Sequence, residues 1–427
     1  MKASILVLIA LTAVLSNAAP PADICNGKLR QRKSFATLSD DDKNAYSDGV
    51  WAMKKSGKYD YFTKKHRAAI RWHQTTQFLP LHRAMMAEFE DELLKVAPTL
   101  TGLPFWDEFS DNSDAINSPI FASPGLGPMA SGPLTGPFEG LTDDNGNEVV
   151  REPNEDVMAD SFSWIPRNQV LAAAMGKFKT FGDMSEKVEL TPHGTFHVVV
   201  GGHMGRPATS PSDSAFWLHH SYTDLMWAVY QGTSTKHFTD YTVLGSGSGK
   251  FQINPTAGVV MYEKQYTNTD MLYYRQRLCY EYVAPNTLPP AQRAAKALAA
   301  AESMATEGGD RESIQVAAKF APIQPLPAAA LQMMMPNMSL EQITKHSANV
   351  AAAINDAAAS LNAKVKSATT PRNGVATEFA AVPVSVALAR LPTMHDMIAQ
   401  AAEVAASVIV DDRANSLIPA VRALHRD

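Results

Sequence analysis

The sequence predicts a mainly α-helical protein, with a four-helix bundle that holds a metal centre. Three observations lead to this fold class. Ser39 and Asp42 have the pattern of a helix N-terminus. His193 and His197 are four residues apart, a spacing that puts both side chains on one face of a helix. An Ala-rich region after residue 285 has apolar residues at helical spacing.

We expect the first helix to run from its cap at Ser39 through Ala52. Side chains that face inward from neighbouring helices build the metal sites of helical bundles. Residues 108–168 are rich in Gly, Pro, Asp, Asn and Ser and are expected to form long surface loops. The helices that would carry the histidines described next are expected around residues 61–75, 81–95, 193–201 and 216–231.

Six histidines form two sets of three, namely His66, His73 and His82, and His193, His197 and His220. Pro80 lies between His73 and His82, and proline is tolerated in the first turn of a helix but not in its interior. We therefore expect His73 to end one segment and His82 to lie early in the next. His219 and His220 point in different directions on a helix, so only one can readily join His193 and His197.

The residue type limits the choice of metal. Neutral imidazole suits copper, zinc and iron, whereas magnesium, calcium and manganese prefer oxygen ligands. Neither set has an obvious carboxylate ligand beside it. Two all-imidazole sets therefore suggest two copper ions that face each other, and hence chemistry with dioxygen.

The motifs around the histidines resemble those of the tyrosinase and catechol oxidase family, with molluscan-type haemocyanins as a more distant relation. The resemblance covers roughly residues 25–285 and has two copper motifs in the family's order, joined by the family's middle motif. The matching residues are Phe78-Leu79-Pro80-Leu81-His82-Arg83, Phe89-Glu90, Leu103-Pro104-Phe105-Trp106-Asp107, His193-Gly194-Thr195-Phe196-His197, Gly201-Gly202-His203-Met204 and Asp213-Ser214-Ala215-Phe216-Trp217-Leu218-His219-His220.

The resemblance implies a copper oxidase that converts o-diphenols, and in tyrosinases also monophenols, to o-quinones with dioxygen. It assigns copper A to His66, His73 and His82, and copper B to His193, His197 and His220. His219 is expected to pack or to hydrogen-bond outside the ligand set. A dioxygen carrier of haemocyanin type is the alternative. We rank it lower, because a carrier would be expected in a large multi-unit chain with a shielding β domain.

The chain departs from the family pattern at three positions. Arg71 stands where many relatives have a cysteine joined to a ligand by a thioether. Gly194 stands where active monophenolases often have an asparagine that, with a carboxylate, positions a base for the phenol proton. Glu189 would be that carboxylate, or else a solvated residue of a charged stretch. Leu225 replaces an arginine, and Asp224 is expected to orient a ligand or neighbouring backbone.

The whole chain has the features of a secreted globular enzyme. Residues 1–18 are expected to be a signal peptide, 19–285 the dicopper domain and 286–427 a C-terminal extension. A net charge of -5 gives no nucleic-acid signature, and no later stretch is apolar enough to span a membrane. Cys25 and Cys279 are the two cysteines of the chain, and we favour a disulfide over two free thiols.

The extension has two stretches with helical period. Ser339 with Gln342 caps the first, and Thr393 with Asp396 precedes the second. The run Met333-Met334-Met335 could load Cu(I) through its thioethers, but we favour flexible apolar packing. We expect the extension to mask the active site until it is cut within residues 286–311; the alternative is a tail that aids folding or solubility. The apolar side of the first stretch consists of Ile343, Val350, Ile354, Leu361 and Val365.

Overall fold

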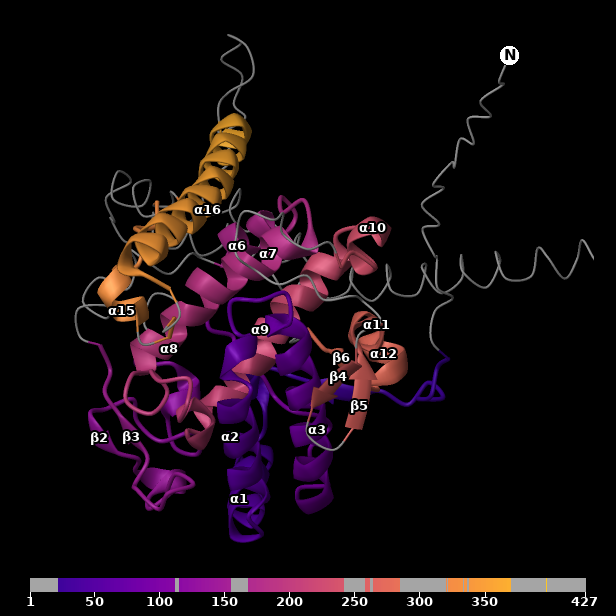
Figure 1. Cartoon of the computed structure of the whole chain (residues 1–427), viewed down its shortest axis with the longest axis vertical. Helices are drawn as coiled ribbons and strands as arrows, with labels where there is room; N and C mark the ends of the chain where they lie inside the picture. Colours follow the sequence, from indigo (N-terminus) through magenta and orange to yellow (C-terminus); the bar gives the residue numbers. More distant parts are fainter. Residues whose placement is uncertain are drawn as a thin grey trace, which may run out of the picture.

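The computed structural model describes residues 22–111, 115–154, 168–241, 258–261, 264–284, 320, 322–332, 334–335, 338–369 and 397. The expected signal peptide, the 286–311 segment and the stretch that begins at Thr393 lie outside these residues, apart from Met397. Figure 1 shows a mainly helical molecule in which α9 runs through the middle and α16 lies across one end. The predicted mainly α-helical class is therefore confirmed, and the arrangement is consistent with the expected four-helix bundle.

A local cap and complete burial account for two of the helices that surround the histidines. Ser39 accepts a hydrogen bond from the backbone of Asp42, so the expected first helix is confirmed. Every residue of the central helix α9 is buried, as expected for a helix enclosed on all sides. The elements are α1 (Asp40–Lys55), α2 (Lys58–Ala68), α3 (Phe78–Val96), α8 (Gly194–Val200) and α9 (Ala215–Gly232).

One of the expected helices is wrong in extent, and another follows an irregular turn. The helix expected over 61–75 ends at Ala68; a short 3-10 helix, Ile70–Trp72, follows it, and His73 has extended backbone. This turn brings the ring of His73 to 5.1 Å from the ring of His66, between centroids. The helix expected over 193–201 is preceded by a π-helical turn, Glu189–His193, that contains Pro192. Because proline has no N–H to donate, the regular hydrogen-bond pattern is interrupted there.

Short strands and further helices complete the part of the chain that carries the two histidine sets. Parallel strands β1 (Arg30–Arg32) and β6 (Tyr280–Tyr282) pair beside the disulfide Cys25–Cys279, which confirms the predicted bond. Most of the described part of 108–168 is loop and turn, as expected. The remaining elements of this region are β2 (Gly132–Pro133), β3 (Val150–Arg151), α6 (Asn168–Met175), α7 (Phe181–Val188), α10 (Thr235–Phe238), β4 (Gly258–Met261), β5 (Lys264–Thr267), α11 (Asn268–Leu272) and α12 (Tyr274–Arg277).

Asp224 lies in a buried hydrogen-bond network of arginines and tyrosines. Its carboxylate accepts hydrogen bonds from Arg83, from Arg32 at 3.2 Å, and from the hydroxyls of Tyr280 and Tyr282. These contacts do not include a ligand histidine, whereas the other expected role of Asp224, the orientation of neighbouring backbone, agrees with its bonds to side chains of β1, α3 and β6. The network ties β1, α3, α9 and β6 together, and its two arginines supply the positive charge that Leu225 does not.

The expected C-terminal extension contributes α15 (Ala328–Gln332) and α16 (Leu340–Thr369), which pack on α6 and α8. The capping box at the start of α16 is confirmed, since Ser339 and Gln342 exchange hydrogen bonds. The predicted apolar side of α16 is buried along its whole length. In Figure 1, α16 lies beside α6 and above α8, so the extension covers one end of the molecule.

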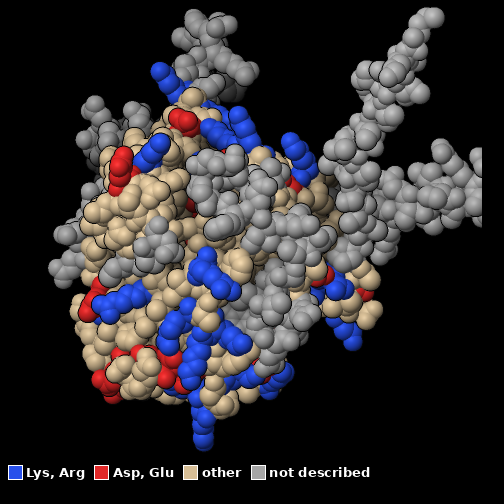
Figure 2. Space-filling view, viewed as in Figure 1, with Lys and Arg blue, Asp and Glu red and all other residues tan. Residues whose placement is uncertain are grey.

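The charges are unevenly distributed over the surface. Figure 2 shows Lys and Arg side chains gathered over the lower centre of one face, where Figure 1 places α1 and α2. Lys55, Lys64 and Lys65 are exposed in this part of the chain. Within the described ranges, no helix is both long enough and apolar enough to cross a membrane.

Candidate metal centre

The first histidine set comes from three consecutive segments. His66 lies near the end of α2, His73 follows the 3-10 helix, and His82 lies in the first half of α3. All three side chains are buried, and their ring centroids are 5.0–5.3 Å apart. The Nε2 atoms of His66 and His82 are 3.3 Å apart. The three rings can therefore offer their nitrogens to one ion.

The second set joins the π-helical turn, α8 and α9. His193 ends the turn, His197 lies one helical turn later, and His220 comes from α9. The Nε2 atom of His197 is 3.0 Å from that of His193 and 3.3 Å from that of His220. The adjacent His219 also has a ring nitrogen within 4.8 Å of this group.

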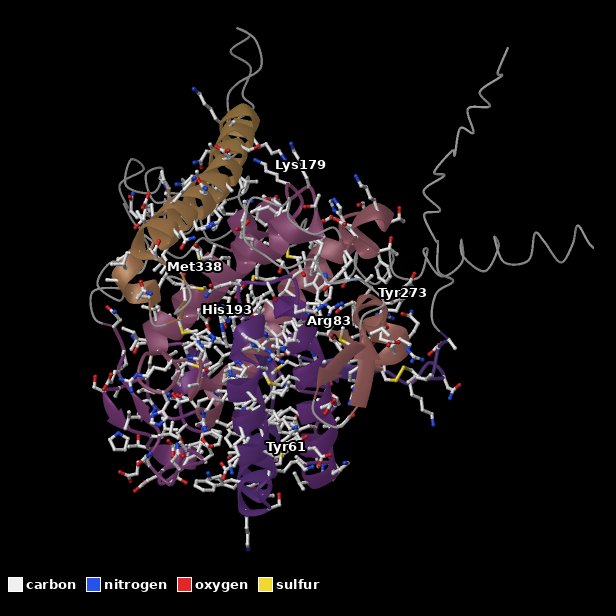
Figure 3. All side chains as sticks on the ribbon, in the orientation of Figure 1. Tyr61, Arg83, Lys179, His193, Tyr273 and Met338 are labelled. Atoms are coloured by element: carbon white, nitrogen blue, oxygen red, sulfur yellow. A yellow bond between two sulfur atoms is a disulfide. The ribbon has the colours of Figure 1, made fainter. Side chains whose placement is uncertain are left out.

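The two sets face each other across a narrow gap. The rings of His82 and His220 are stacked, with centroids 4.2 Å apart and planes 9° from parallel. Phe216 packs against His220 at 4.2 Å, and Phe78 packs against His193 at 4.7 Å, both between centroids. Aromatic packing therefore holds the two sets in place and keeps their surroundings apolar. Figure 3 shows His193 in the interior, among the crossing helices.

Burial keeps the imidazoles neutral. It lowers the pKa of His73 to about 4 and that of His197 to about 3, and it holds the pKa values of the other four well below their usual range. A neutral imidazole has one bare nitrogen lone pair, which is what a metal ion requires. At neutral pH the six rings are thus in the protonation state of metal ligands.

The hydrogen bonds at the other ring nitrogens make this argument stronger. Nδ1 of His193 donates to the carbonyl of Glu189 at 2.9 Å, and Nδ1 of His197 donates to that of Met204 at 2.7 Å. A carbonyl only accepts, so both protons lie on Nδ1 and both Nε2 atoms carry lone pairs. Two lone pairs 3.0 Å apart repel unless a cation lies between them. This donor set fits copper, and ligand histidines are commonly oriented by such bonds.

His219 has a different partner from the six. Its Nδ1 bonds to the carboxylate of Glu108, and neither side chain is exposed. The prediction that His219 forms a hydrogen bond outside the ligand set agrees with this contact. Sequence analysis missed Glu108, although an acidic residue directly after Trp106-Asp107 of the middle motif was a possible signal.

Glu189 is buried, so its interpretation as a solvated residue is wrong. Its carboxylate accepts the backbone N–H of Gln74, the residue after His73, and thereby joins the two histidine sets. Gln74 has a positive φ of 60°, and sequence analysis gave no sign of its role. Arg71 is exposed, and its guanidinium lies over the ring of Trp72. As the sequence predicted, an arginine at this position cannot form the thioether that a cysteine forms in many relatives.

Gly194 lies where the C-terminal extension meets the centre. A Cβ atom added to Gly194 would be 3.0 Å from Cδ2 of Leu331, in α15. The side-chain amide of Gln74 donates to the sulfur of Met335 at 3.2 Å, and Met334 and Met335 are buried. This burial agrees with apolar packing of the methionine run, of which Met333 lies outside the described residues. Figure 3 shows Met338 between α16 and His193 in this view.

Comparisons with known proteins agree with this geometry. The family model for the common central domain of tyrosinase matches residues 56–233. A tyrosinase of Streptomyces glaucescens is 30% identical over 237 residues, which cover 47% of this chain and 82% of the relative. A putative tyrosinase-like protein of Caenorhabditis elegans is 28% identical over 224 residues, but the match covers only 32% of its length.

A solved structure shows the same fold. The polyphenol oxidase of Thermothelomyces thermophila superposes with a TM-score of 0.51 at 21% identity, over 60% of this chain and 89% of that one. The matching part of the sequence contains both histidine sets, and the sets have the donor chemistry of a copper pair. This chain therefore belongs to the tyrosinase family of dicopper oxidases.

Proposed function

We propose that the protein is a secreted copper oxidase that converts o-diphenols to o-quinones with dioxygen and acts weakly on monophenols. The observation that carries this proposal is the pair of buried, neutral imidazole sets that face each other. When bound, the two copper ions supply the electron transfer from the phenol to dioxygen. Each diphenol loses two electrons and two protons, and each dioxygen takes electrons from two diphenols to form water.

In this proposal the six histidines divide between the two ions. Copper A is held by His66, His73 and His82, and copper B by His193, His197 and His220. The backbone carbonyls that accept from Nδ1 of four of these rings keep their Nε2 lone pairs available. The apolar packing around the rings limits access of water to the reacting oxygen atoms.

The preference for diphenols follows from Gly194 and Glu189. Gly194 has no side chain that could orient a base for the proton of a monophenol. Glu189 uses a carboxylate oxygen to accept the Gln74 backbone N–H, and so holds the chain next to His73. A diphenol needs less help of this kind, because its oxidation requires no prior hydroxylation.

The C-terminal extension, in this proposal, masks the centre before activation. Leu331 lies against Gly194 and Met335 against Gln74, so the extension contacts a neighbour of a histidine in each set. The apolar face of α16 is buried against the dicopper region, which holds α15 in place. A tail that only aids folding would have no need to contact these two positions.

Secretion is supported by two features. The N-terminal residues 1–18 have the pattern of a signal peptide, and the Cys25–Cys279 disulfide is typical of oxidising compartments.

Oxygen consumption by the copper-loaded protein tests the main proposal. We expect turnover with a catechol, slow turnover with a matching monophenol, and a several-fold gain with the catechol after cleavage within residues 286–311 and removal of the fragment. Reversible dioxygen binding without quinone formation would instead identify a carrier. Equal turnover before and after the cut would refute masking while leaving the oxidase in place.

Gly194→Asn tests the basis of the substrate preference. We expect the variant to raise the monophenol rate selectively, because the amide can cooperate with Glu189. The assay requires protein freed of its extension, since a side chain at this position meets Leu331. Gly194→Ala is the matched control, which adds a Cβ without an amide. A wild type that hydroxylates monophenols as fast as it oxidises catechols would contradict this interpretation.

A further inference from the structure

A buried carboxylate supports the second histidine set from outside it. Glu108 follows the middle motif in a loop, and His219 lies in α9 directly before His220. Nδ1 of His219 forms a hydrogen bond with Oε1 of Glu108, and both side chains are completely buried. The pair thus connects this loop to the helix that carries one member of the second set.

His219 is packed against the other two members of the set. Its ring stacks on that of His193, with centroids 5.2 Å apart and planes 24° from parallel. It also meets His197 edge-on, at 4.6 Å between centroids. Any rotation of His219 would therefore push directly on two rings that converge on one point.

The remaining polar atoms of the pair, Nε2 of His219 and Oε2 of Glu108, are buried and have no hydrogen-bond partner among the residues that the structure describes. Burying a carboxylic group with one oxygen unpaired costs free energy, which an apolar side chain at position 108 would avoid. The pair is therefore poorly suited to a purely structural role.

Histidines at metal centres are commonly held by a carboxylate or carbonyl at the nitrogen that faces away from the metal. Within the second set, His193 and His197 bond to backbone carbonyls. Nδ1 of His220 has no such partner among the described residues. Glu108 therefore adds a side-chain restraint beside this set, through its hydrogen bond to His219.

We infer that Glu108 is a positioning residue for the second copper: it fixes the ring of His219, and through that ring the orientation of His193 and His197. The inference rests on the proposed assignment of copper B to His193, His197 and His220. Glu108 contacts no reacting atom in this scheme. We expect Glu108 to increase the affinity of the protein for copper B.

Three variants test the inference. Glu108→Leu removes the acceptor, whereas Glu108→Gln keeps an oxygen that can accept from Nδ1. Asp111→Asn is the matched control, because Asp111 is a neighbouring carboxylate that bonds to Trp106 and Ser118 and to no histidine among its known contacts. Copper affinity is measured by competition with a chelator. The unfolding temperature is measured with and without copper.

We expect Glu108→Leu to weaken one of the two copper ions by about 10- to 100-fold, the usual range for loss of such a partner. In a His82→Ala background, the loss should affect the copper that remains. The gain in unfolding temperature on adding copper should shrink in Glu108→Leu and be largely kept in Glu108→Gln and Asp111→Asn. Wild-type copper affinity in Glu108→Leu, with equal destabilisation of the copper-free and copper-loaded forms, would overturn the inference.

If Glu108→Leu does not fold, the variant His219→Phe provides a second test of the inference. Phenylalanine preserves the stacking but cannot bond to Glu108, so it should weaken the same copper ion. Unchanged copper affinity in His219→Phe would also overturn the inference. A wild type that binds two copper ions but forms no quinone would reject the proposed oxidase and leave the role of Glu108 open to the same affinity measurement.

Discussion

The candidate ligands are histidines whose burial would be unfavourable without a metal. Each is nearly inaccessible to water, and the closest nitrogen pair, between His193 and His197, brings two lone pairs together at 3.0 Å. Neutral rings held by backbone carbonyls cannot relieve this repulsion by exchanging a proton without losing those bonds. A bound cation would relieve this repulsion, and the first two predictions follow from that.

We predict that His82→Ala or His220→Ala abolishes quinone formation and lowers the copper content by one of the two ions. Both ions are needed, since dioxygen must be reduced by the pair. Copper per chain is measured by atomic absorption, and oxygen uptake is measured with a catechol. His237→Ala, outside both sets, should retain copper and turnover. Full activity in either ligand variant would reject the assignment.

The stability of the copper-free protein should depend on pH. His73 and His197 have pKa values lowered to about 4 and about 3, below the usual value of 6.5 in the unfolded chain. The unfolded chain therefore binds more protons, and the folded state loses stability as the pH falls from 6.5 towards 3. Each residue accounts for a loss on the order of 3–5 kcal/mol. Constant unfolding free energy in urea between pH 6.5 and 4 would contradict this.

At the scale of elements, an extended segment before α15 is clamped to α16. Asn355 exchanges two hydrogen bonds with the backbone of Ile323, at 2.7 and 2.9 Å. Asn362, two helical turns later, does the same with Phe320, at 2.9 Å for both bonds. The clamp leads into α15, so it helps to determine where Leu331 lies.

We predict that Asn355→Leu combined with Asn362→Leu raises catechol turnover of the uncut protein several-fold. The double variant leaves two backbone segments without partners, which should cost about 2–4 kcal/mol of docking free energy. Lys345→Ala, at an exposed position of α16, is the control. Turnover is compared before and after removal of the extension. An unchanged ratio in the double variant would mean that the clamp does not control access.

At the scale of the whole molecule, the two ends of the dicopper region are joined twice. The Cys25–Cys279 bond links residues separated by 254 positions, and β1 pairs with β6 next to it. The Arg32 guanidinium lies over the ring of Tyr280 at 3.5 Å and also pairs with Glu90 of α3. The N-terminal strand is thereby anchored to the centre of the fold.

We predict that Cys25→Ala combined with Cys279→Ala lowers the free energy of unfolding by about 4–5 kcal/mol, because a long loop in the unfolded chain is no longer closed. Urea denaturation of the copper-free protein measures the loss. Copper stoichiometry should remain at the wild-type value, since neither cysteine is near the histidine sets. Loss of copper in a variant that is still folded would show that the clasp also shapes the centre.

Features that depend on local spacing could be predicted from the amino-acid sequence. Such features are the caps at Ser39 and Ser339, the apolar side of α16 and the position of Pro80 in the first turn of α3. Each depends on residues that lie close together in the sequence. The six histidines could be grouped because their motifs resemble those of a known family. The position of His73 was harder to predict. Its spacing from His66 had suggested a continuous helix, but the helix ends at Ala68.

Contacts between groups that are distant in the sequence became known from the folded structure alone. Glu108 and His219 are separated by 111 positions, and Leu331 reaches Gly194 from another part of the chain. Asp224 shows the same limit, since its nearness to a ligand in sequence suggested a ligand-orienting role, yet its side chain points to Arg32, Arg83 and two tyrosines. Spacing along a helix determines the face on which a residue lies, but the partner on that face depends on how the helices pack.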